Sequence, residues 1–567
     1  MKILSIYPYT HISSSSLMID GKIVAASCEE RFNREKMSTK FPIQSAQWCL
    51  KYANITWDDL DVIAIPWNPM ININNVSGRW VNEMYWRGQM LSHIPGQLMR
   101  AINGPIADSM EIKFNNTRIV YLNHHECHAA NAFYLSPFEE ADVLTIDGHG
   151  ESESCFLGFA DKNGVSRVHS VEYPHSLGLF YGTFTDFLGF TPDVDEWKVM
   201  ALYSYATRKN KYDKKIQSLI NLNKKGFELD LTYFDYYLFD RRPHFYNKKL
   251  LDLIGKPRKR GQSLEKRHYE IAGAMQRTFK KTVDHLLKIT KQMSGKDNIV
   301  LNGGAAMNCV YNGQIDDNKT YKDSFIGPCP DDSGVGIGAC YLANERFSNK
   351  KYKNNECKDN YWGPEFSDQE IDLIIKKFKL NKTKPKNLFK DVAELISNGN
   401  LVGWFQGRME FGHRALGNRS ILADPRKVRT KDKVNSAVKY RETFRPFAPA
   451  TLNEFVDDIF DMKNKNRKVR FMERAYHVKK KWRHQLGAVT HIDGTGRVQS
   501  VEKEVNPKFH KLITEFYNIT QVPVLLNTSF NLNGEPIVMT PEHAIRTFFT
   551  CGLDYLVLGN FLISKNK

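Results

Sequence analysis

The sequence predicts an α/β protein with two or more domains, and three observations support this. Short apolar strands alternate with segments of helical periodicity over residues 2–67, and the pattern repeats over residues 118–159. A polar, charged stretch from Ser348 to Asp359 separates this part from a third α/β pattern. The chain has 567 residues, of which 41% are hydrophobic and 25% charged, so it is too long for a single hydrophobic core.

The N-terminal part begins with a predicted β-hairpin. Apolar and polar residues alternate from Lys2 to Ala26 around a turn at Asp20 and Gly21. A helix at Ile43–Tyr52 and a strand at Asp61–Trp67 follow. The second pass has the expected order strand, helix, strand, strand, over residues 118–122, 124–134, 142–146 and 154–159. Two similar halves are therefore possible.

Residues 207–268 differ from their surroundings, because they are rich in Lys, Arg, Asn and aromatic residues. We expect an insertion or a lid. Helical periodicity returns at Tyr269–Met293, and a strand at Asn298–Leu301 leads into Gly303 and Gly304. In the C-terminal part we expect a helix over residues 392–398 and strands over residues 401–405 and 522–526, which makes a second α/β domain.

Composition and charge exclude some classes of protein. The longest apolar stretches fall short of the roughly 20 residues that a membrane helix requires, so no transmembrane segment or membrane binding is expected. The nine cysteines are scattered without a CxxC pair, which favours a reducing, cytoplasmic location. Eighty Lys and Arg against 63 Asp and Glu give a net charge of +17, which favours ligands that carry phosphate.

A metal site is predicted around the string NHHECHAA. His124 and His128 stand four residues apart, so on a helix both imidazoles project from one face, whereas His125 points elsewhere. Pairs of this spacing are also common as surface or core residues. Asp147 ends an apolar strand and is followed by Gly148 and Gly150, a position where carboxylates face clefts, although a turn cap is the alternative.

Asp331 and Asp332 precede a Ser-Gly turn and a helix start of small residues, GVGIGA, which suits packing against a nucleotide. Two His and two Asp would suit a divalent, iron-like cation with open coordination positions. The spacing is not HExxH, so metalloprotease chemistry is not indicated.

A second site is predicted where arginines crowd among glycines. The string GWFQGRMEFGHRALGNRSILADPR holds four arginines, and VKYRETFRPFAPA adds two more and a lysine. Guanidinium groups at such density suit phosphate binding, with a solvated basic face as the alternative. Two polar clusters downstream are typical of pocket linings. The candidate residues are Arg408, Arg414, Arg419, Arg426, Lys439, Arg441, Arg445, His491, Asp493, Thr495, Arg497, Asn527, Thr528, Ser529 and Asn531.

Several strings in the N-terminal part carry a resemblance to a known family. CEERFNREK, NHHECHAA, IDGHGE, EWKVMAL, NGGAAMNCVYN and PDDSGVGIGA resemble the N-terminal domain of NodU/CmcH-type O-carbamoyltransferases. The resemblance implies an actin/hexokinase-like fold over residues 1–345, similar to the threonylcarbamoyl-transfer proteins, with two related α/β halves around a nucleotide cleft. It also implies that His124, His128, Asp147 and Asp332 are the metal ligands, with Fe(II) expected, and that Gly303, Gly304 and Asn308 line the adenosine side.

The C-terminal strings resemble the second domain of the same family, whose fold is YrdC-like. This domain is expected at residues 385–567, after a linker region at 346–384. His413 stands where the family usually has Pro, which puts the rigidity of that loop in doubt.

The resemblance implies two half-reactions. ATP and carbamoyl phosphate would give carbamoyl adenylate in the C-terminal domain, and the carbamoyl group would pass to an acceptor hydroxyl at the N-terminal metal site. Lys36 is a candidate for orienting the carbamoyl group, or an exposed helix lysine. The family's HDSS string reads HISS here, so the expected carboxylate is replaced by Ile12. His11 then remains the candidate base, or an ordinary hairpin histidine.

We expect the acceptor to be a hydroxymethylated pyrimidine in DNA or in a nucleotide. The insertion carries basic residues that could neutralise a phosphate backbone and aromatic residues that could stack on a base, unless they only form a solvated lid. These are Arg241, Arg242, Lys256, Arg258, Lys259 and Arg260, with Tyr233, Phe234, Tyr236, Tyr237 and Phe239. The alternatives are a small-molecule or sugar hydroxyl, tRNA threonylcarbamoyl transfer, and a nucleic-acid-binding module without catalysis. An oligomer is possible.

Overall fold

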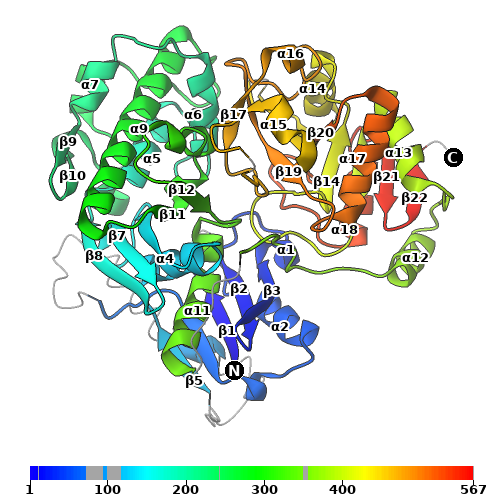
Figure 1. Ribbon diagram of the computed structural model, residues 1–567, viewed down its shortest axis with the longest axis horizontal. Coiled ribbons are helices and arrows are strands. Elements are labelled where there is room, and N and C mark those ends of the chain that lie inside the picture. Colours follow the sequence, from blue (N-terminus) through cyan, green and yellow to red (C-terminus); the bar gives the residue numbers. More distant parts are fainter. Residues whose placement is uncertain are drawn as a thin grey trace. The chain divides into compact units, whose positions relative to one another are not determined.

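The computed structural model of the chain, drawn in Figure 1, describes residues 1–9, 12–71, 93–98, 117–241, 243–348, 356–442, 444–465 and 467–565. It has two compact units. The first comprises Met1–Glu29, Ser38–Asn308 and Ile315–Cys357, and the second comprises Glu30–Met37, Cys309–Gln314 and Lys358–Lys567. Two short segments from the N-terminal part of the sequence therefore belong to the second unit.

The first sheet of unit 1 has five strands, in the order β3-β2-β1-β4-β5. The hairpin predicted at the N-terminus is confirmed. β2 pairs antiparallel with β3 across a turn in which Asp20 and Gly21 have positive φ. β1 pairs antiparallel with the other edge of β2. β4 and β5 add in parallel. The strands are Lys2–Tyr7, Ser14–Ile19, Lys22–Cys28, Val62–Ile65 and Arg118–Tyr121.

The second sheet of unit 1 repeats this topology. Its order is β12-β11-β6-β7-β8, with β6, β7 and β8 antiparallel and β11 and β12 added in parallel beside β6. The strands are Ala141–Ile146, Glu153–Asp161, Gly164–Glu172, Asn298–Asn302 and Asp323–Ile326. Reading each sheet from its first strand gives the same pairing scheme, which confirms the two related α/β halves of an actin/hexokinase-like domain.

Two helices link the halves of unit 1. α4 (His124–Tyr134) packs on the second sheet, α11 (Val335–Phe347) packs on the first, and the two helices contact each other. A Cβ atom on Gly338 of α11 would lie only 1.8 Å from the carbonyl oxygen of Cys127 on α4. Gly338 of the GVGIGA string therefore serves the packing of α11 against α4.

The other helices of unit 1 cover the outer faces. α2 (Ile43–Tyr52) contacts β2 and β3, and the 29-residue helix α9 (Lys266–Ser294), which is green in Figure 1, contacts β6 and β7. α5 (Leu177–Phe187) and α6 (Glu196–Leu202) pack against α9.

The insertion at residues 207–268 is folded. It contains α7 (Asp213–Gln217), a hairpin of β9 (Ile220–Asn223) and β10 (Gly226–Leu229), two 3-10 helices at 231–233 and 236–241, and α8 (Lys248–Ile254).

Unit 2 is built on a seven-stranded mixed sheet in the order β19-β15-β20-β14-β13-β21-β22. α13 (Leu388–Ser397) and α17 (Pro507–Thr520) pack against each other, and α17 contacts β15 and β20, whereas α18 (Pro541–Phe549) contacts β13 and β21. The α/β class expected for a YrdC-like domain is confirmed. The strands of the large sheet are β13 Val402–Phe405, β14 Arg419–Ala423, β15 Ala448–Leu452, β19 Gln499–Val501, β20 Val524–Ser529, β21 Tyr555–Leu558 and β22 Phe561–Ser564.

A three-stranded sheet, β16-β17-β18, completes unit 2. Its strands are Phe460–Asp461, Ala475–Val478 and Thr495–Arg497, and the remaining helices are α1 Glu30–Asn33, α10 Cys309–Asn312, α12 Asp368–Lys377, α14 Val428–Val434, α15 Val456–Ile459 and α16 Lys480–Arg483. Among the described residues, no helix combines the length and apolarity needed to cross a membrane. All nine cysteines are free and buried.

Candidate functional site

The candidate metal centre in unit 1 forms where two parallel strands end beside a helix start. β6 and β11 are neighbours, so Asp147, which follows β6, and Asn302, the last residue of β11, lie at the same edge of the sheet. α4 begins at His124 after Asn123, whose side chain accepts the N–H of Glu126 at 2.9 Å as an N-cap. The first turns of α4 therefore present His124 and His128 to Asp147.

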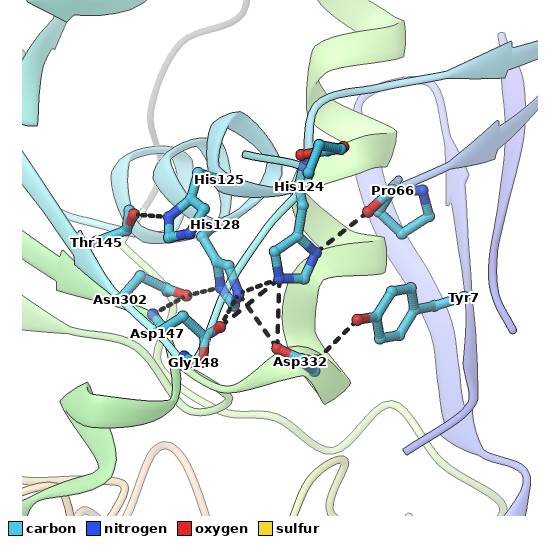
Figure 2. Close-up of polar contacts among 12 residues, drawn as sticks. Tyr7, Pro66, His124, His125, His128, Thr145, Asp147, Gly148, Asn302 and Asp332 are labelled. Atoms are coloured by element: carbon cyan, nitrogen blue, oxygen red, sulfur yellow. Dashed lines mark hydrogen bonds and ion pairs between the residues drawn. The ribbon is translucent and has the colours of Figure 1, made fainter. Parts of the chain in front are cut away.

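The structure brings together the four residues that the resemblance implies as ligands, as Figure 2 shows. His124 Nε2 and His128 Nε2 are 3.1 Å apart. His128 Nε2 lies 2.9 Å from Asp147 Oδ2 and 3.4 Å from Asp332 Oδ1, and His124 Nε2 lies 3.6 and 3.5 Å from the same two oxygens. His125 turns away and contacts Thr145, as the spacing predicts.

This geometry fits one divalent cation. Ligand atoms about 2.1 Å from an ion are separated from one another by roughly 3.0–3.4 Å, and the five distances given above run from 2.9 to 3.6 Å. Although burial opposes the charged form, Asp332 and Asp147 raise the pKa of His124 well above its usual value. Buried carboxylates facing imidazoles are a donor set of the kind that binds divalent cations.

Three further residues hold the ligands in place, and the sequence did not single them out. Asn302 Oδ1 lies 2.6 Å from His128 Nδ1, and the Tyr7 hydroxyl donates to Asp332 Oδ2 at 2.8 Å. The buried Glu151 carboxylate accepts the backbone N–H of His124 at 2.9 and 3.1 Å, and that of Asn68 at 2.7 Å. Partners that orient metal ligands in this way are usually as important as the ligands themselves.

Of the residues expected on the adenosine side, Gly303 and Gly304 lie beside this centre. Gly303 has a φ of +87°, and a Cβ atom there would approach the Ile146 carbonyl oxygen to 2.2 Å, so only glycine fits. A Cβ atom on Gly304 would lie 3.0 Å from Asp147 Oδ1. Asn308 and Gln276 exchange side-chain amide hydrogen bonds of 3.0 and 3.1 Å.

In unit 2, the arginine-rich string forms a loop that is organised from within. The buried Glu410 carboxylate accepts the backbone N–H groups of Leu416 and Asn418 at 2.6 and 2.8 Å. The fully buried Arg419 guanidinium donates to four carbonyl oxygens, those of Gln406, Gly407, Asn418 and Pro364, at 2.6 to 3.1 Å, and lies 3.6 Å from the Phe405 ring centroid. The structure thus directs Arg419 toward the protein backbone.

Other arginines of the loop also contact the protein. Arg408 donates to the carbonyl oxygens of Gly363 and Trp362, and Arg426 pairs with Asp424 at 2.7 Å. Arg414 and Arg497 both lie close enough to Cys309 to lower the pKa of its thiol, against the larger opposite effect of burial.

The structure brings four predicted residues together as a cluster of cations: Lys439, Arg441, Arg445 and Arg497. Burial, together with Arg441 and Arg445, lowers the pKa of Lys439 well below its usual value. Burial, together with Arg445 and Arg497, likewise lowers the pKa of Arg441 well below its usual value. Within the described part of the chain, no carboxylate lies at ion-pairing distance from Lys439, Arg441 or Arg497. Arg445 pairs with Glu442 at 3.2 Å.

The downstream polar residues support this cation cluster. Lys439 Nζ donates to the Ser529 carbonyl oxygen at 2.6 Å and to Asn531 Oδ1 at 2.7 Å. Asn527 donates to the Ala415 carbonyl oxygen and to Gln499 Oε1, so it ties β20 to the arginine-rich loop, and Thr528 is its neighbour on β20. His491 Nδ1 contacts Thr495 Oγ1 at 3.1 Å, and burial lowers the pKa of His491 to about 4, so its ring is neutral at physiological pH.

The two candidate catalytic residues have different outcomes. Lys36 lies in the segment that belongs to unit 2, near enough to Lys439 to contribute to the lowering of the Lys439 pKa. This segment is fastened to unit 2 by Arg34, which donates to the carbonyl oxygens of Ile537 and Pro536 at 2.7 and 2.8 Å. His11 lies outside the described residues.

In the insertion, several residues expected to bind nucleic acid are used by the fold. Phe234 and Tyr236 are 0% and 6% exposed, and Arg258 donates to the carbonyl oxygens of Gln262 and Leu188. Tyr233 and Tyr237 are half-buried, whereas Lys256, Lys259 and Arg260 are exposed. Arg242 and the side chains of Phe239 and Arg241 lie outside what the structure describes.

Two family models match the chain. The carbamoyltransferase N-terminus matches residues 2–341, and the carbamoyltransferase C-terminus matches residues 393–565. The first match contains the metal centre, and the second contains the cation cluster.

Three relatives illustrate the range of similarity. An uncharacterised protein of Synechocystis is 36% identical over 99% of this chain and 96% of its own length. The nodulation protein NolNO of Sinorhizobium fredii is 34% identical over 98% of this chain and 79% of its own length. The 3'-hydroxymethylcephem-O-carbamoyltransferase of Amycolatopsis lactamdurans is 30% identical over 46% of this chain and 48% of its own length.

Proposed function

The chain belongs to the carbamoyltransferase family, and from this premise we propose that it uses ATP to activate carbamoyl phosphate and transfers the carbamoyl group to an acceptor hydroxyl. It is a transferase of the NodU/CmcH type. The proposal concerns the two cosubstrates, the division of the reaction between two sites, the metal and the acceptor.

The observation that carries the proposal is the cation cluster of unit 2. Arg441 and Arg445 add to the effect of burial in lowering the pKa of Lys439, and Arg445 and Arg497 do the same for Arg441, against a smaller opposite effect of Glu442. Such an arrangement is costly unless an anion binds, because like charges repel strongly in a partly buried site. Carbamoyl phosphate together with the ATP phosphates supplies that anion.

In the first half-reaction, water hydrolyses carbamoyl phosphate: the bond between its carbamoyl and phosphate groups breaks, and carbamate and inorganic phosphate form. A carbamate oxygen then attacks the α-phosphorus of ATP, the bond to the β-phosphate oxygen breaks, and carbamoyl adenylate and pyrophosphate form. Lys439 and the neighbouring arginines offset the negative charge that develops on the phosphates. Ser529 and Asn531 hold Lys439 Nζ in place for this role.

In the second half-reaction, an acceptor hydroxyl attacks the carbamoyl carbon, the bond to the adenylate oxygen breaks, and the carbamate ester and AMP are released. We assign this step to unit 1, where His124, His128, Asp147 and Asp332 would hold a divalent cation, with Fe(II) the expected metal. Such a cation supplies Lewis-acid stabilisation to the adenylate phosphate. Asn302 and Tyr7 orient His128 and Asp332.

For the acceptor we favour the hydroxyl of a small molecule. The burial of Phe234 and Tyr236 and the backbone contacts of Arg258 remove three of the residues that base stacking or phosphate binding would use. One relative is named for a hydroxymethyl acceptor, hydroxymethylcephem. The second candidate is a hydroxymethylated pyrimidine in DNA. The exposed Lys256, Lys259 and Arg260 favour it, because they could neutralise a phosphate backbone. We place the reaction in the cytoplasm, in keeping with nine buried, free thiols.

The test is incubation of the purified protein with ATP, ¹³C-labelled carbamoyl phosphate and a panel of hydroxyl compounds, with hydroxymethylated and plain DNA included, followed by mass spectrometry. We expect labelled carbamoyl groups on a small hydroxyl compound, together with AMP and pyrophosphate, and only when both cosubstrates are present. Labelling without ATP would contradict the proposed activation. Labelling confined to hydroxymethylated DNA would favour the second acceptor.

A further inference from the structure

Tyr440 stands out beside the cation cluster because its backbone is strained and its side chain is exposed. Its φ and ψ are +42° and +50°, in the left-handed region that residues other than Gly, Asn and Asp seldom adopt. The side chain is 61% exposed, although its neighbours in the chain are the buried Lys439 and the half-buried Arg441. An exposed aromatic residue thus lies between two cations of the proposed phosphate site.

The surrounding contacts force this conformation. Residues Asn435–Lys439 form a π-helix, a rare element that is frequent at functional sites, and the Tyr440 N–H closes it on the Asn435 carbonyl oxygen at 2.6 Å. The π-helix is fixed from outside, since the Ala437 carbonyl oxygen accepts the N–H of Gly552 at 2.7 Å.

Both neighbours of Tyr440 are also fixed. Lys439 is held by Ser529 and Asn531, and Arg441 donates to Asn435 Oδ1 at 3.0 Å while its guanidinium lies 4.4 Å from the Phe447 ring centroid. Both cations are thus held by the protein, whereas the Tyr440 side chain between them in the sequence is exposed.

A second exposed apolar residue lies on the segment that carries Arg497 of the cluster. Ile492 is 66% exposed and follows His491, on the loop that leads into Arg497. Exposed apolar groups next to buried cations complement a ligand that has a flat apolar part and an anionic part.

We propose that Tyr440 is the face on which the adenine base of ATP stacks while the cation cluster holds the phosphates. The inference rests on the proposed function and adds the recognition of the base. Carbamoyl phosphate has no apolar surface to occupy such a face, whereas a nucleotide has one. Aromatic rings bind bases through their faces, and the exposed Tyr440 ring is free for this contact.

The experiment compares ATP with inorganic tripolyphosphate, which has the charge of ATP without its base. Both ligands are titrated into the full-length protein and into Y440N and Y440F. Asn tolerates the left-handed conformation, so Y440N removes the ring and leaves the backbone unstrained, and Y440F keeps the ring. We expect Y440N to bind ATP about tenfold more weakly and tripolyphosphate unchanged, and Y440F to bind ATP within about twofold of the wild type.

The steady-state counterpart is a rise in the KM for ATP in Y440N with no change in the KM for carbamoyl phosphate. Unchanged ATP affinity in Y440N, or an equal loss for ATP and tripolyphosphate, would overturn the stacking proposal and leave the proposed function standing. A wild-type protein that binds neither ligand would refute the proposed function, and the stacking proposal with it.

Discussion

Replacing Arg419 with Met should lower the stability of unit 2, because Arg419 contacts the protein backbone and not a ligand. The guanidinium is fully buried and donates to the carbonyl oxygens of Gln406, Gly407, Asn418 and Pro364. Met fills a similar volume but donates nothing, so these acceptors lose their partner inside the protein. Burial lowers the pKa of Arg419 to about 9, so the group is charged at neutral pH and the bonds are charge-assisted.

The expected magnitude follows from these contacts. Each hydrogen bond to a charged group contributes roughly 1.5–3 kcal/mol, and leaving a buried acceptor unpaired costs about 1–3 kcal/mol. The sum is reduced because Met no longer requires a cation to be buried, and because carbonyl groups that share one donor are not independent. We expect a loss of about 3 kcal/mol in the free energy of unfolding.

The assay is urea unfolding followed by a signal from unit 2, with R546M as the control. Arg546 makes an exposed ion pair with Glu535, and its side chain is 54% exposed, so the control should lose less than about 1 kcal/mol. An R419M variant that unfolds like the wild type but loses pyrophosphate exchange would refute this reasoning and show that Arg419 acts on the phosphates directly.

Two further predictions concern unit 1. A divalent cation at about 100 times its Kd should raise the unfolding temperature of unit 1 by about 5 °C. The H128A variant should not show this rise. The same rise in H128A would mean that the cation binds elsewhere. Burial and Asp193 raise the pKa of Glu196 to about 7, so the folded unit binds more protons than the unfolded chain above pH 4.5. The free energy of unfolding of unit 1 should therefore fall by about 1–2 kcal/mol as the pH rises from 4.5 through 7, and E196Q should remove that slope, as urea midpoints at pH 5 and pH 8 would show.

The sequence predicts those parts of the fold that depend on local pattern. The hairpin at Asp20 and Gly21 is confirmed because alternation and turn residues define it within a few positions. The helix expected at 269–293 is found as α9 at Lys266–Ser294, since an amphipathic pattern of this length has no competing interpretation. The C-terminal sheet is larger than expected, because short buried strands such as β21 and β22 are apolar without a distinctive period.

In the candidate sites, too, the sequence predicts what depends on local pattern and misses what depends on contacts between distant segments. His124, His128 and Asp147 are visible in the sequence because they stand on one face of a helix or at a strand end, whereas the choice of Asp332 over Asp331 depends on the family resemblance. Glu151 and Asn302 are not visible in the sequence, because their roles arise from segments brought together only by folding. Arg419 has the same sequence context as arginines that bind phosphate, and only its burial reveals its contacts with the backbone. Nothing in the pattern of residues 30–37 indicates that they belong to unit 2.

The most direct test of the two-site account is the carbamoyl-phosphate-dependent exchange of labelled pyrophosphate into ATP by H128A. The account assigns adenylate formation to the cation cluster of unit 2 and transfer to the metal centre of unit 1. It therefore predicts exchange within about twofold of the wild type, while carbamoyl transfer to any acceptor is lost. Loss of exchange together with transfer, in a variant that unfolds like the wild type, would contradict the division of the reaction between two sites.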